Sequence, residues 1–274
     1  MIKPGEEQSG RPRLAVLIPA FNAQHGLERS LASLRDDGAR FEVVVVDDGS
    51  TEPIILPEGL PFPAILIRLP RNQGITSALN AGLERIVAGG FEYVARLDAG
   101  DVSLPGRFAA QMAFLDAHPD HAVVGTYAEI VDEAGRHLHG FRPPTSHTGL
   151  ARALRYRNAI CHPSVMMRIA ALRTAGFYVS NYPGGEDYEL WLRLGRRYHL
   201  ANLDRILVRK EETTSSITAR RFRLGVSRLR IQFDHFDPRS IHAYLGIARS
   251  LALLLVSRGM LLRLMRLRAP SRPT

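Results

Sequence analysis

The chain has 274 residues, of which 45% are hydrophobic and 23% charged, and it carries a formal net charge of +9. This composition excludes an intrinsically disordered protein, and the length is enough to bury about 75% of the unfolded surface. The single cysteine, Cys161, excludes a secreted scaffold held together by internal disulfides. The N-terminal residues lack the apolar segment of a signal peptide, and no run of 18 uncharged apolar residues occurs, so we predict a cytoplasmic chain without a membrane span.

Short apolar runs alternate with amphipathic segments in the first hundred residues. Leucine and isoleucine recur at helical spacing in residues 25–35 and 74–87, which predicts two helices. The apolar runs predict buried strands at residues 14–19, 41–46, 64–69 and 91–97. Strands that alternate with helices predict an α/β fold with a mostly parallel sheet.

The second half of the chain has a less regular pattern. It predicts strands at 122–131, 162–168 and 205–209 and a helix at 187–198. From Ala219 the pattern is helical, with a break at Asp237 and Pro238. We therefore expect two parts, a catalytic domain over residues 1–218 and a basic helical tail over 219–274.

Three of the predicted strands are followed directly by polar or acidic residues, at 19–22, 47–50 and 98–101. Ligands of open α/β sheets bind beyond the carboxyl ends of the strands. Because parallel strands bring those ends to one edge, we expect the functional site there.

Asp47 and Asp48 have two readings. An Asp-Gly-Ser sequence favours turns, so both residues can simply shape the chain reversal. Alternatively, one carboxylate accepts hydrogen bonds from a base or a ribose, because charged acceptors make the stronger hydrogen bonds.

The second acidic pair, Asp98 and Asp101, also has two readings. Carboxylates three residues apart can hold Mg²⁺ or Mn²⁺, which prefer oxygen ligands and share them with phosphates. Asp101 and Ser103 also precede Pro105, as expected of residues that cap a helix.

Glu186 and Asp187 open an apolar predicted helix after the sequence Pro-Gly-Gly. Acidic residues at a helix start interact favourably with the helix dipole, and a carboxylate at the mouth of a pocket can also act as a general base. His162 lacks a second histidine at ligand spacing, so we expect it to have a structural or substrate-lining role.

Together these segments resemble the inverting family 2 glycosyltransferases, which have the GT-A fold. The resemblance runs from Val16 to about Thr218 with the motifs in the family's order. The matching segments are VLIPAFN at 16–22, VVVVDDGS at 43–50, RNQGITSALNAGL at 71–83, RLDAGDVSLPGR at 96–107, HPSVMMR at 162–168 and EDYELWL at 186–192.

The resemblance implies transfer of a sugar, with inversion, from a nucleotide-sugar donor to an acceptor hydroxyl. UDP is the nucleotide it favours, and the acceptor is a glycan or a lipid-linked sugar in cell-surface or exopolysaccharide synthesis. It places Asp187 as the catalytic base and Asp98 with Asp101 on Mg²⁺ or Mn²⁺. It places these residues on the nucleotide sugar: Pro19, Ala20, Asn22, Asp47, Asp48, Arg71 and Asp98. It places His162, Glu186 and Trp191 on the acceptor side.

One departure from the family pattern is Gly100, which stands where the family commonly has a metal-binding carboxylate. Asp101 can reach the ion by a shifted loop, which a glycine permits; the alternative is that the metal is bound weakly or not at all. The substitution also leaves open a non-catalytic sugar-nucleotide-binding or scaffold protein. A sugar-nucleotide pyrophosphorylase is disfavoured because no glycine-rich basic loop follows the first strand. A dehydrogenase is disfavoured because no G-x-G-x-x-G follows any strand.

The tail carries all of the basic excess. Residues 219–274 contain twelve arginines against Asp234 and Asp237. Residues 241–257 are apolar except for a polar stripe on one helical face, and 260–267 repeat this pattern with arginines one turn apart. An apolar face beside arginines predicts a peripheral contact with the inner face of the cell membrane. The alternative is packing on the catalytic domain or on a second subunit. We expect no nucleic acid, because aromatic residues are few and no recognised binding module is present.

Overall fold

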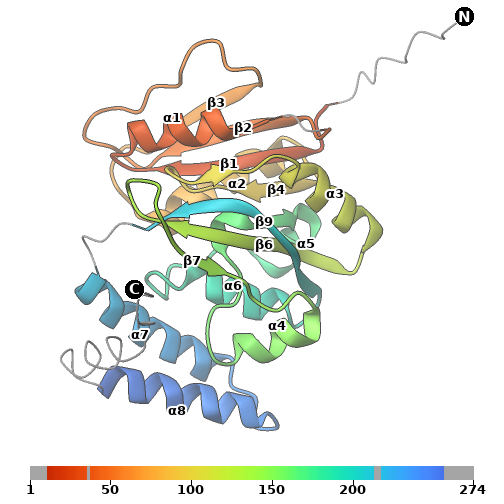
Figure 1. Cartoon of the computed structure of the whole chain (residues 1–274), viewed down its shortest axis with the longest axis vertical. Coiled ribbons are helices and arrows are strands. Elements are labelled where there is room, and N and C mark those ends of the chain that lie inside the picture. Colours follow the sequence, from red (N-terminus) through yellow and green to blue (C-terminus); the bar gives the residue numbers. More distant parts are fainter. Residues whose placement is uncertain (1–10, 36–37, 213–216, 256–274) are drawn as a thin grey trace, which may run out of the picture.

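The computed structural model describes residues 11–35, 38–212 and 217–255. A single nine-stranded sheet runs through it in the order β3-β2-β1-β4-β8-β6-β9-β5, with β7 paired to β6 (Figure 1). The strands are β1 Leu14–Ala20, β2 Phe41–Asp47, β3 Ala64–Arg68, β4 Tyr93–Arg96, β5 Val102–Ser103, β6 His121–Val131, β7 His137–Phe141, β8 Met166–Arg168 and β9 His199–Glu211. The helices are α1 Gln24–Ser33, α2 Ile75–Ala88, α3 Arg107–Ala117, α4 His147–Leu154, α5 Ile169–Ala175, α6 Glu186–Leu194, α7 Ile217–Asp234 and α8 Ile241–Leu255, with a 3-10 turn at His162–Ser164.

The four strands of the N-terminal half are parallel, as the alternation of strands and helices predicts. Side chains alternate along β1 so that Ala15 and Leu17 join one half of the core and Val16 and Ile18 the other. Helices α2, α4, α5 and α6 contribute to the first half, and α1 and α3 contribute to the second. The sheet is therefore covered on both faces, which is why its central strands are apolar throughout.

Three predictions for the second half were inaccurate in extent. Residues 162–168 form a 3-10 turn and a three-residue strand, because Pro163 has no N–H to donate to a sheet. The helix predicted over 187–198 ends at Leu194, with Gly195 as its C-cap. The strand predicted over 205–209 is the 13-residue β9.

β9 pairs in parallel with β6 over almost its whole length, from His199 beside His121 to Glu211 beside Val131. Since β6 is antiparallel to β8, which is itself antiparallel to β4, β6 and β9 run in the direction of β4. The last residues of β9 therefore reach the edge at which β1, β2 and β4 end. The first residues of β9 lie at the opposite edge.

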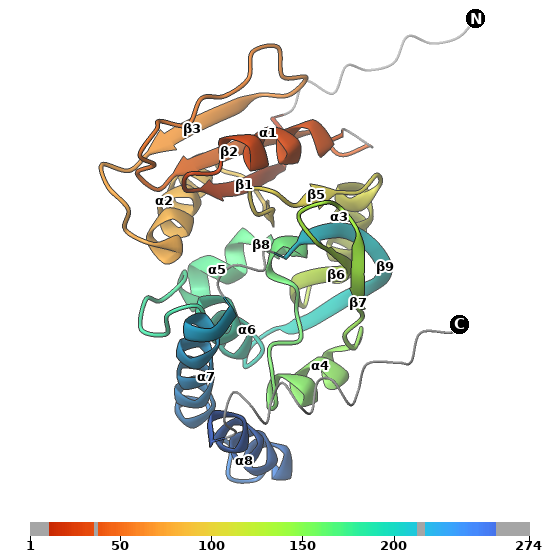
Figure 2. The ribbon, with the colours of Figure 1, turned by 60° about the vertical axis from the view of Figure 1, so that its left-hand side comes forward.

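The helices α7 and α8 lie on the side of α4 and α6 that is away from β1–β3 (Figures 1 and 2). Ile231 of α7 belongs to the main core, and its side chain lies against Gly185 at the start of α6. The region named as a tail thus packs on the catalytic domain through part of its surface. The predicted segment at 260–267 lies outside the described residues.

α8 packs through the polar and small side of the helix. Ala243, Gly246 and Ser250 are buried, and His242 and Arg249 bond to Tyr156. The apolar side faces outward, with Ile241 63%, Leu245 49% and Leu255 84% exposed. Among the described residues, no helix combines the length and the apolar character needed to cross a membrane.

We expect Gly246→Ala to destabilise the protein. A Cβ atom at this position would lie 2.0 Å from the carbonyl oxygen of Arg155, which is backbone and cannot move aside easily. Helix propensity alone would raise the free energy of unfolding by about 1 kcal/mol, whereas the clash lowers it by about 1–3 kcal/mol. Gly225→Ala is the control, because its new Cβ meets only the flexible end of Leu254. Urea unfolding of both variants checks this; a stabilised Gly246→Ala variant would contradict the packing of α8.

Candidate active site

The polar residues after β1 and β2 lock the two strand ends together. The N–H of Asn22 donates to the Ser50 hydroxyl at 2.8 Å, and the N–H of Thr51 donates to the Asn22 side-chain oxygen at 2.9 Å. Asn22 adopts φ 50°, a left-handed conformation that asparagine tolerates better than most residues. Pro19 and Ala20, in register with Val46 and Asp47, hold this turn at the carboxyl edge of the sheet.

Asp47 is fully buried and shapes the turn that follows β2. Its carboxylate accepts the N–H groups of Ser50 and Ile54 and pairs with Arg68 at 3.1 Å. Burial alone would raise the pKa of Asp47, but these donors outweigh it and the net shift is downward. Of the two readings of Asp47, the turn-forming one therefore describes the contacts seen.

Asp48 links the β2 turn to the loop that precedes α2. Its two carboxylate oxygens accept the N–H groups of Gln73 and Gly74, each at 2.8 Å. The two segments touch so closely that a Cβ on Gly49 would lie 2.3 Å from the backbone of Arg71. Glycine is therefore required at position 49, and the backbone of the exposed residue Arg71 is held beside the acidic turn.

The loop of Asp98 and Asp101 is anchored on α1. The Ser30 hydroxyl donates to the carbonyl of Asp101 and accepts the N–H of Gly100. Gly100 itself adopts φ 110°, which residues with a side chain rarely adopt. The glycine at the departure from the family motif therefore has a conformational role in turning Asp101 inward.

Asp98 pairs with the fully buried guanidinium of Arg96 at 2.6 Å, while its own side chain is 36% exposed. Burial on its own would raise the pKa of Asp98, but Arg96, His162 and Lys210 outweigh it, so the pKa is lowered. The group is an anion at neutral pH. It is the carboxylate of this loop that is open to a ligand.

Asp101 is buried, and one of its oxygens accepts the N–H of Glu211 at 3.0 Å. The other oxygen has no hydrogen-bond partner among the residues that the structure describes. Burial and the nearby Asp98 raise the pKa of Asp101 to about 7. A buried carboxylate oxygen without a donor, close to a second carboxylate, fits a hard cation such as Mg²⁺ or Mn²⁺.

His162 lies next to this pair. Its Nε2 atom is 3.4 Å from the Arg96 Nε and 2.8 Å from the Tyr178 hydroxyl. Because Arg96 can only donate, Nε2 must accept, and the ring is neutral with its proton on Nδ1. Burial and Arg96 accordingly lower the pKa of His162 well below its ordinary value.

Asp187 comes from the start of α6. Its carboxylate accepts the Asn158 amide at 2.6 Å and the N–H of Tyr188 at 2.7 Å. Burial and the adjacent Glu186 raise the pKa of Asp187 to about 7, although Asn158, Tyr188 and Lys210 act in the opposite direction. A carboxylate that titrates near neutral pH is suited to accept a proton.

Glu186 and Trp191 of the predicted acceptor set are buried. Trp191 has no exposed surface and belongs to the main core, where its ring packs edge-on against His162 at 5.9 Å between centroids. In this arrangement Trp191 supports His162 from beneath and has no surface to offer an acceptor. His162 is the member of the set that is partly exposed.

Lys210 is a site residue that the sequence analysis missed. Burial alone would lower the pKa of Lys210, but Cys161, Asp98, Asp101 and Asp187 outweigh it and the pKa is raised. Lys210 thus lies among the three candidate catalytic carboxylates, at the end of β9. The sequence does distinguish this residue, because Lys3 and Lys210 are the only lysines among 36 basic residues.

The mixed sheet, with helices on both faces and carboxylates at the ends of its parallel strands, has the GT-A fold. Two solved structures of 18% identity share it. One is the mannosyltransferase PcManGT of Pyrobaculum calidifontis with GDP-Man and Mn²⁺ (TM-score 0.61; 90% of this chain, 70% of that one). The other is residues 1–349 of S. aureus TarS with UDP-GlcNAc (TM-score 0.62; 87% and 71%).

The sequence model of glycosyl transferase family 2 matches residues 15–174, and the chain belongs to this family. The amylovoran biosynthesis glycosyltransferase AmsE of Erwinia amylovora is 32% identical over 215 residues, 76% of this chain and 79% of that protein. The putative glycosyltransferase EpsE of Bacillus subtilis is 28% identical over 225 residues, 78% of each. The family resemblance and the predicted fold are thereby confirmed.

We expect Asp101→Asn to be more stable than the wild type at pH 8, and by a larger margin there than at pH 5. A folded pKa of about 7, against 3.8 for the free carboxyl, means that the unfolded state loses its proton first, so ionisation of Asp101 destabilises the fold progressively as pH rises from about 4 to 7. The variant removes this effect, on the order of 1–3 kcal/mol. Urea unfolding with a chelator present measures it. An equal difference between variant and wild type at both pH values would show that Asp101 does not titrate in this range.

Proposed function

We propose that the protein is an inverting hexosyltransferase that moves a sugar from a nucleotide-sugar donor, UDP-linked in the first instance, to a hydroxyl of a growing polysaccharide or lipid-linked glycan. The observation that carries the proposal is the chain of contacts that joins the strand ends to α6. Asp98 pairs with Arg96, Arg96 approaches His162, and His162 packs against Trp191 of the helix that carries Asp187. The end of β9, which carries Lys210, bonds to Asp101 of the same loop. A relative supports the pathway, since AmsE is an amylovoran biosynthesis glycosyltransferase. UDP-GlcNAc in the TarS structure supports the donor class.

In the proposed reaction, Asp187 accepts the proton of the acceptor hydroxyl as that oxygen attacks the anomeric carbon. The new carbon–oxygen bond forms while the bond from the same carbon to the diphosphate breaks, and the electron pair leaves with the nucleoside diphosphate. Asn158 and the N–H of Tyr188 hold the carboxylate in place. A single displacement inverts the anomeric centre and needs no second carboxylate as a nucleophile.

The donor lies along the two locked turns in this proposal. Pro19, Ala20 and Asn22 border the nucleoside, Asp48 accepts its N–H or hydroxyl groups, and Arg71 faces its phosphates. Each Asp48 oxygen accepts one N–H group and keeps a second lone pair for the donor. Asp47 does not contact the donor directly, because it has no exposed surface and is held by Ser50, Ile54 and Arg68.

Asp98 and Asp101 would hold Mg²⁺ or Mn²⁺, which would neutralise charge that develops on the departing diphosphate. Lys210 supplies a fixed positive charge in the same place. The acceptor lies against the partly exposed His162. Trp191 and Glu186 do not touch the acceptor; Trp191 positions His162, and Glu186 positions Asp187.

We expect Asp187→Asn to lower kcat by roughly 10²–10⁴-fold while the Kd for UDP-sugar stays within about threefold of wild type. The amide keeps the size of the carboxylate but cannot take the proton. Asp204→Asn, which removes an exposed carboxylate of β9, is the matched control and should leave kcat unchanged.

Two measurements test this assignment, single-turnover transfer and calorimetric donor binding. In the wild type, kcat/KM should rise with pH to about 7 and then level off, because the base must be ionised. More than a tenth of wild-type turnover in Asp187→Asn would remove this residue from the role of base.

The proposal includes a peripheral membrane contact through α8, which would bring the site to a lipid-linked acceptor. What supports it is the orientation of this helix, whose polar stripe is used against the protein and whose apolar side is exposed. Tyr244, Leu245, Leu251 and Leu255 are exposed on that side. Burial of such side chains in a lipid interface is favourable, and basic residues nearby add about 1 kcal/mol each at an anionic surface.

We expect the full chain to float with vesicles that contain anionic lipid, and the double variant Leu245→Glu, Leu251→Glu to remain in the soluble fraction. Both positions are exposed, so the fold should tolerate the change. Ile55→Glu is the control, because this exposed isoleucine lies on the loop between β2 and β3. Equal flotation of the double variant and the wild type would contradict a contact through α8.

A further inference from the structure

Four of the ten histidines of the chain gather at one place outside the catalytic site: His118, His121, His147 and His199. His121 opens β6 and His199 opens β9, and the two are register partners. Their ring centroids are 5.2 Å apart, and His147 stacks on His199 at 4.4 Å. The pairing of the two strands therefore creates a cluster from segments far apart in the sequence.

Asp120 holds two of these rings together. One of its carboxylate oxygens is 2.8 Å from the Nδ1 atom of His121, and the other is 2.7 Å from the Nδ1 atom of His199. Because an ionised carboxylate only accepts, the Nδ1 of His121 donates its proton to Asp120, whereas His199 makes a close ion-pair contact with the second oxygen. The three ligand atoms all lie within 4.8 Å of one another, and this is the one group of its kind found in the described part of the chain.

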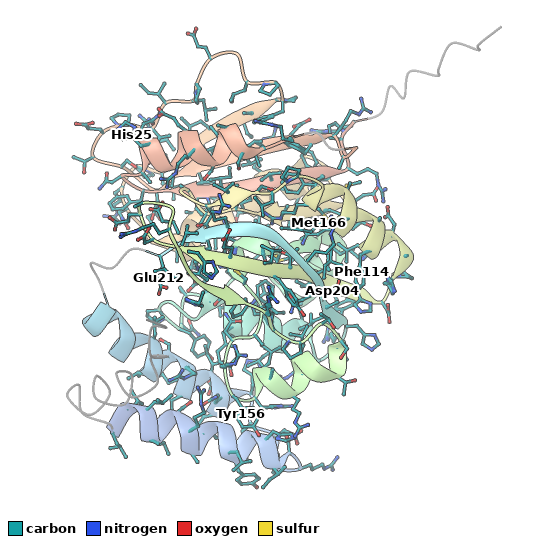
Figure 3. The ribbon with its side chains drawn as sticks, in the orientation of Figure 1. His25, Phe114, Tyr156, Met166, Asp204 and Glu212 are labelled. Carbon is teal, nitrogen blue, oxygen red and sulfur yellow. The ribbon has the colours of Figure 1, made fainter. Side chains whose placement is uncertain are left out.

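The cluster is remote from the catalytic edge. His199 and Lys210 are at opposite ends of β9, eleven residues apart, which is on the order of 30 Å in an extended strand. In Figure 3, Phe114 and Asp204, which border the cluster, lie together at one end of the sheet, and Glu212 lies at the other. A ligand here would not share the donor site.

The surroundings leave room for a ligand. The cluster borders an open hollow of about 510 Å³ between the end of α3, the start of α4 and the first half of β9. The side chains of Asp120 and His199 are 57% and 50% exposed, whereas that of His121 is 12% exposed. An ion can therefore reach the group from solvent, while the mostly buried His121 provides a ligand whose position is fixed by packing.

We infer that Asp120, His121 and His199 form a second metal site, which takes zinc or a similar imidazole-preferring divalent ion. An ion between the three residues would replace the ring proton that joins His121 to Asp120 and would bind the Nδ1 atom of His199 on the other side of the carboxylate. Tetrahedral zinc with bonds near 2.0–2.1 Å sets its ligand atoms about 3.3 Å apart, so shifts of only about an ångström suffice. Imidazole nitrogen selects Zn²⁺ over Mg²⁺. Mg²⁺ instead prefers the all-oxygen pair at Asp98 and Asp101.

The consequence is a link between two turns. Asp120 and His121 follow α3, and His199 follows α6, so one ion would fix the turn that begins β6 to the turn that begins β9. Since β9 carries Lys210 at its far end, the site would stabilise the strand without entering the reaction. The remaining coordination position would face the hollow.

The test is zinc binding to the untagged full chain by competition with a chromophoric chelator, in millimolar Mg²⁺ to occupy any all-oxygen site. Wild type should bind one Zn²⁺ at micromolar concentration or below and release protons as it does so. His121→Ala with His199→Ala should weaken binding on the order of 100-fold or more. The matched control removes the two histidines of β7, by His137→Ala with His139→Ala, and should bind like wild type.

Asp120→Asn serves as a second variant, because this exposed position should not affect folding, and circular dichroism checks each protein. It should weaken zinc binding at least tenfold. The inference is overturned if wild type binds no Zn²⁺ at free zinc concentrations on the order of 100 micromolar. It is also overturned if either cluster variant binds Zn²⁺ as tightly as wild type. Catalytic turnover is not the readout, so the result is independent of the proposed transfer reaction.

Discussion

A guanidinium with no exposed surface lies beneath the candidate active site, and the arrangement of the candidate catalytic groups depends on it. Arg96, at the end of β4, pairs with Asp98 at 2.6 Å, donates to the carbonyl of Leu17 and approaches Nε2 of His162. A buried charge costs several kcal/mol unless its partners are well placed. Arg96 therefore holds Asp98 as an anion, His162 as a neutral ring and the ends of β1 and β4 in register.

The pKa values of the carboxylates around this cation are shifted in opposite directions. Proximity to Arg96 keeps the pKa of Asp98 low, whereas burial raises the pKa of Asp101 and of Asp187 to about 7. Environments that separate the pKa values of neighbouring acids divide their roles between permanent anion and proton acceptor. Lys210 lies among all three, so its positive charge limits how far the two raised values can rise.

Much of this site was predictable because its signals are local. The acidic residues after β2 and β4 follow apolar runs, those at the start of α6 precede an apolar helix, and parallel strands bring their ends to one edge. Burial was not predictable in the same way. The resemblance places Trp191 on the acceptor side, but this residue is packed in the core against His162, because α6 turns that face toward the sheet.

The sequence by itself determined the α/β class, the parallel N-terminal strands and the carboxylate positions, since hydrophobic period and turn residues act over a few neighbours. The tertiary structure decided which distant segments meet. The parallel pairing of β6 and β9 brings Lys210 to the catalytic edge and His199 to His121 at the other. The packing of Gly246 against Arg155 turns the polar side of α8 inward and leaves its leucines outside. Both outcomes depend on contacts between residues remote in the chain, which no local pattern encodes.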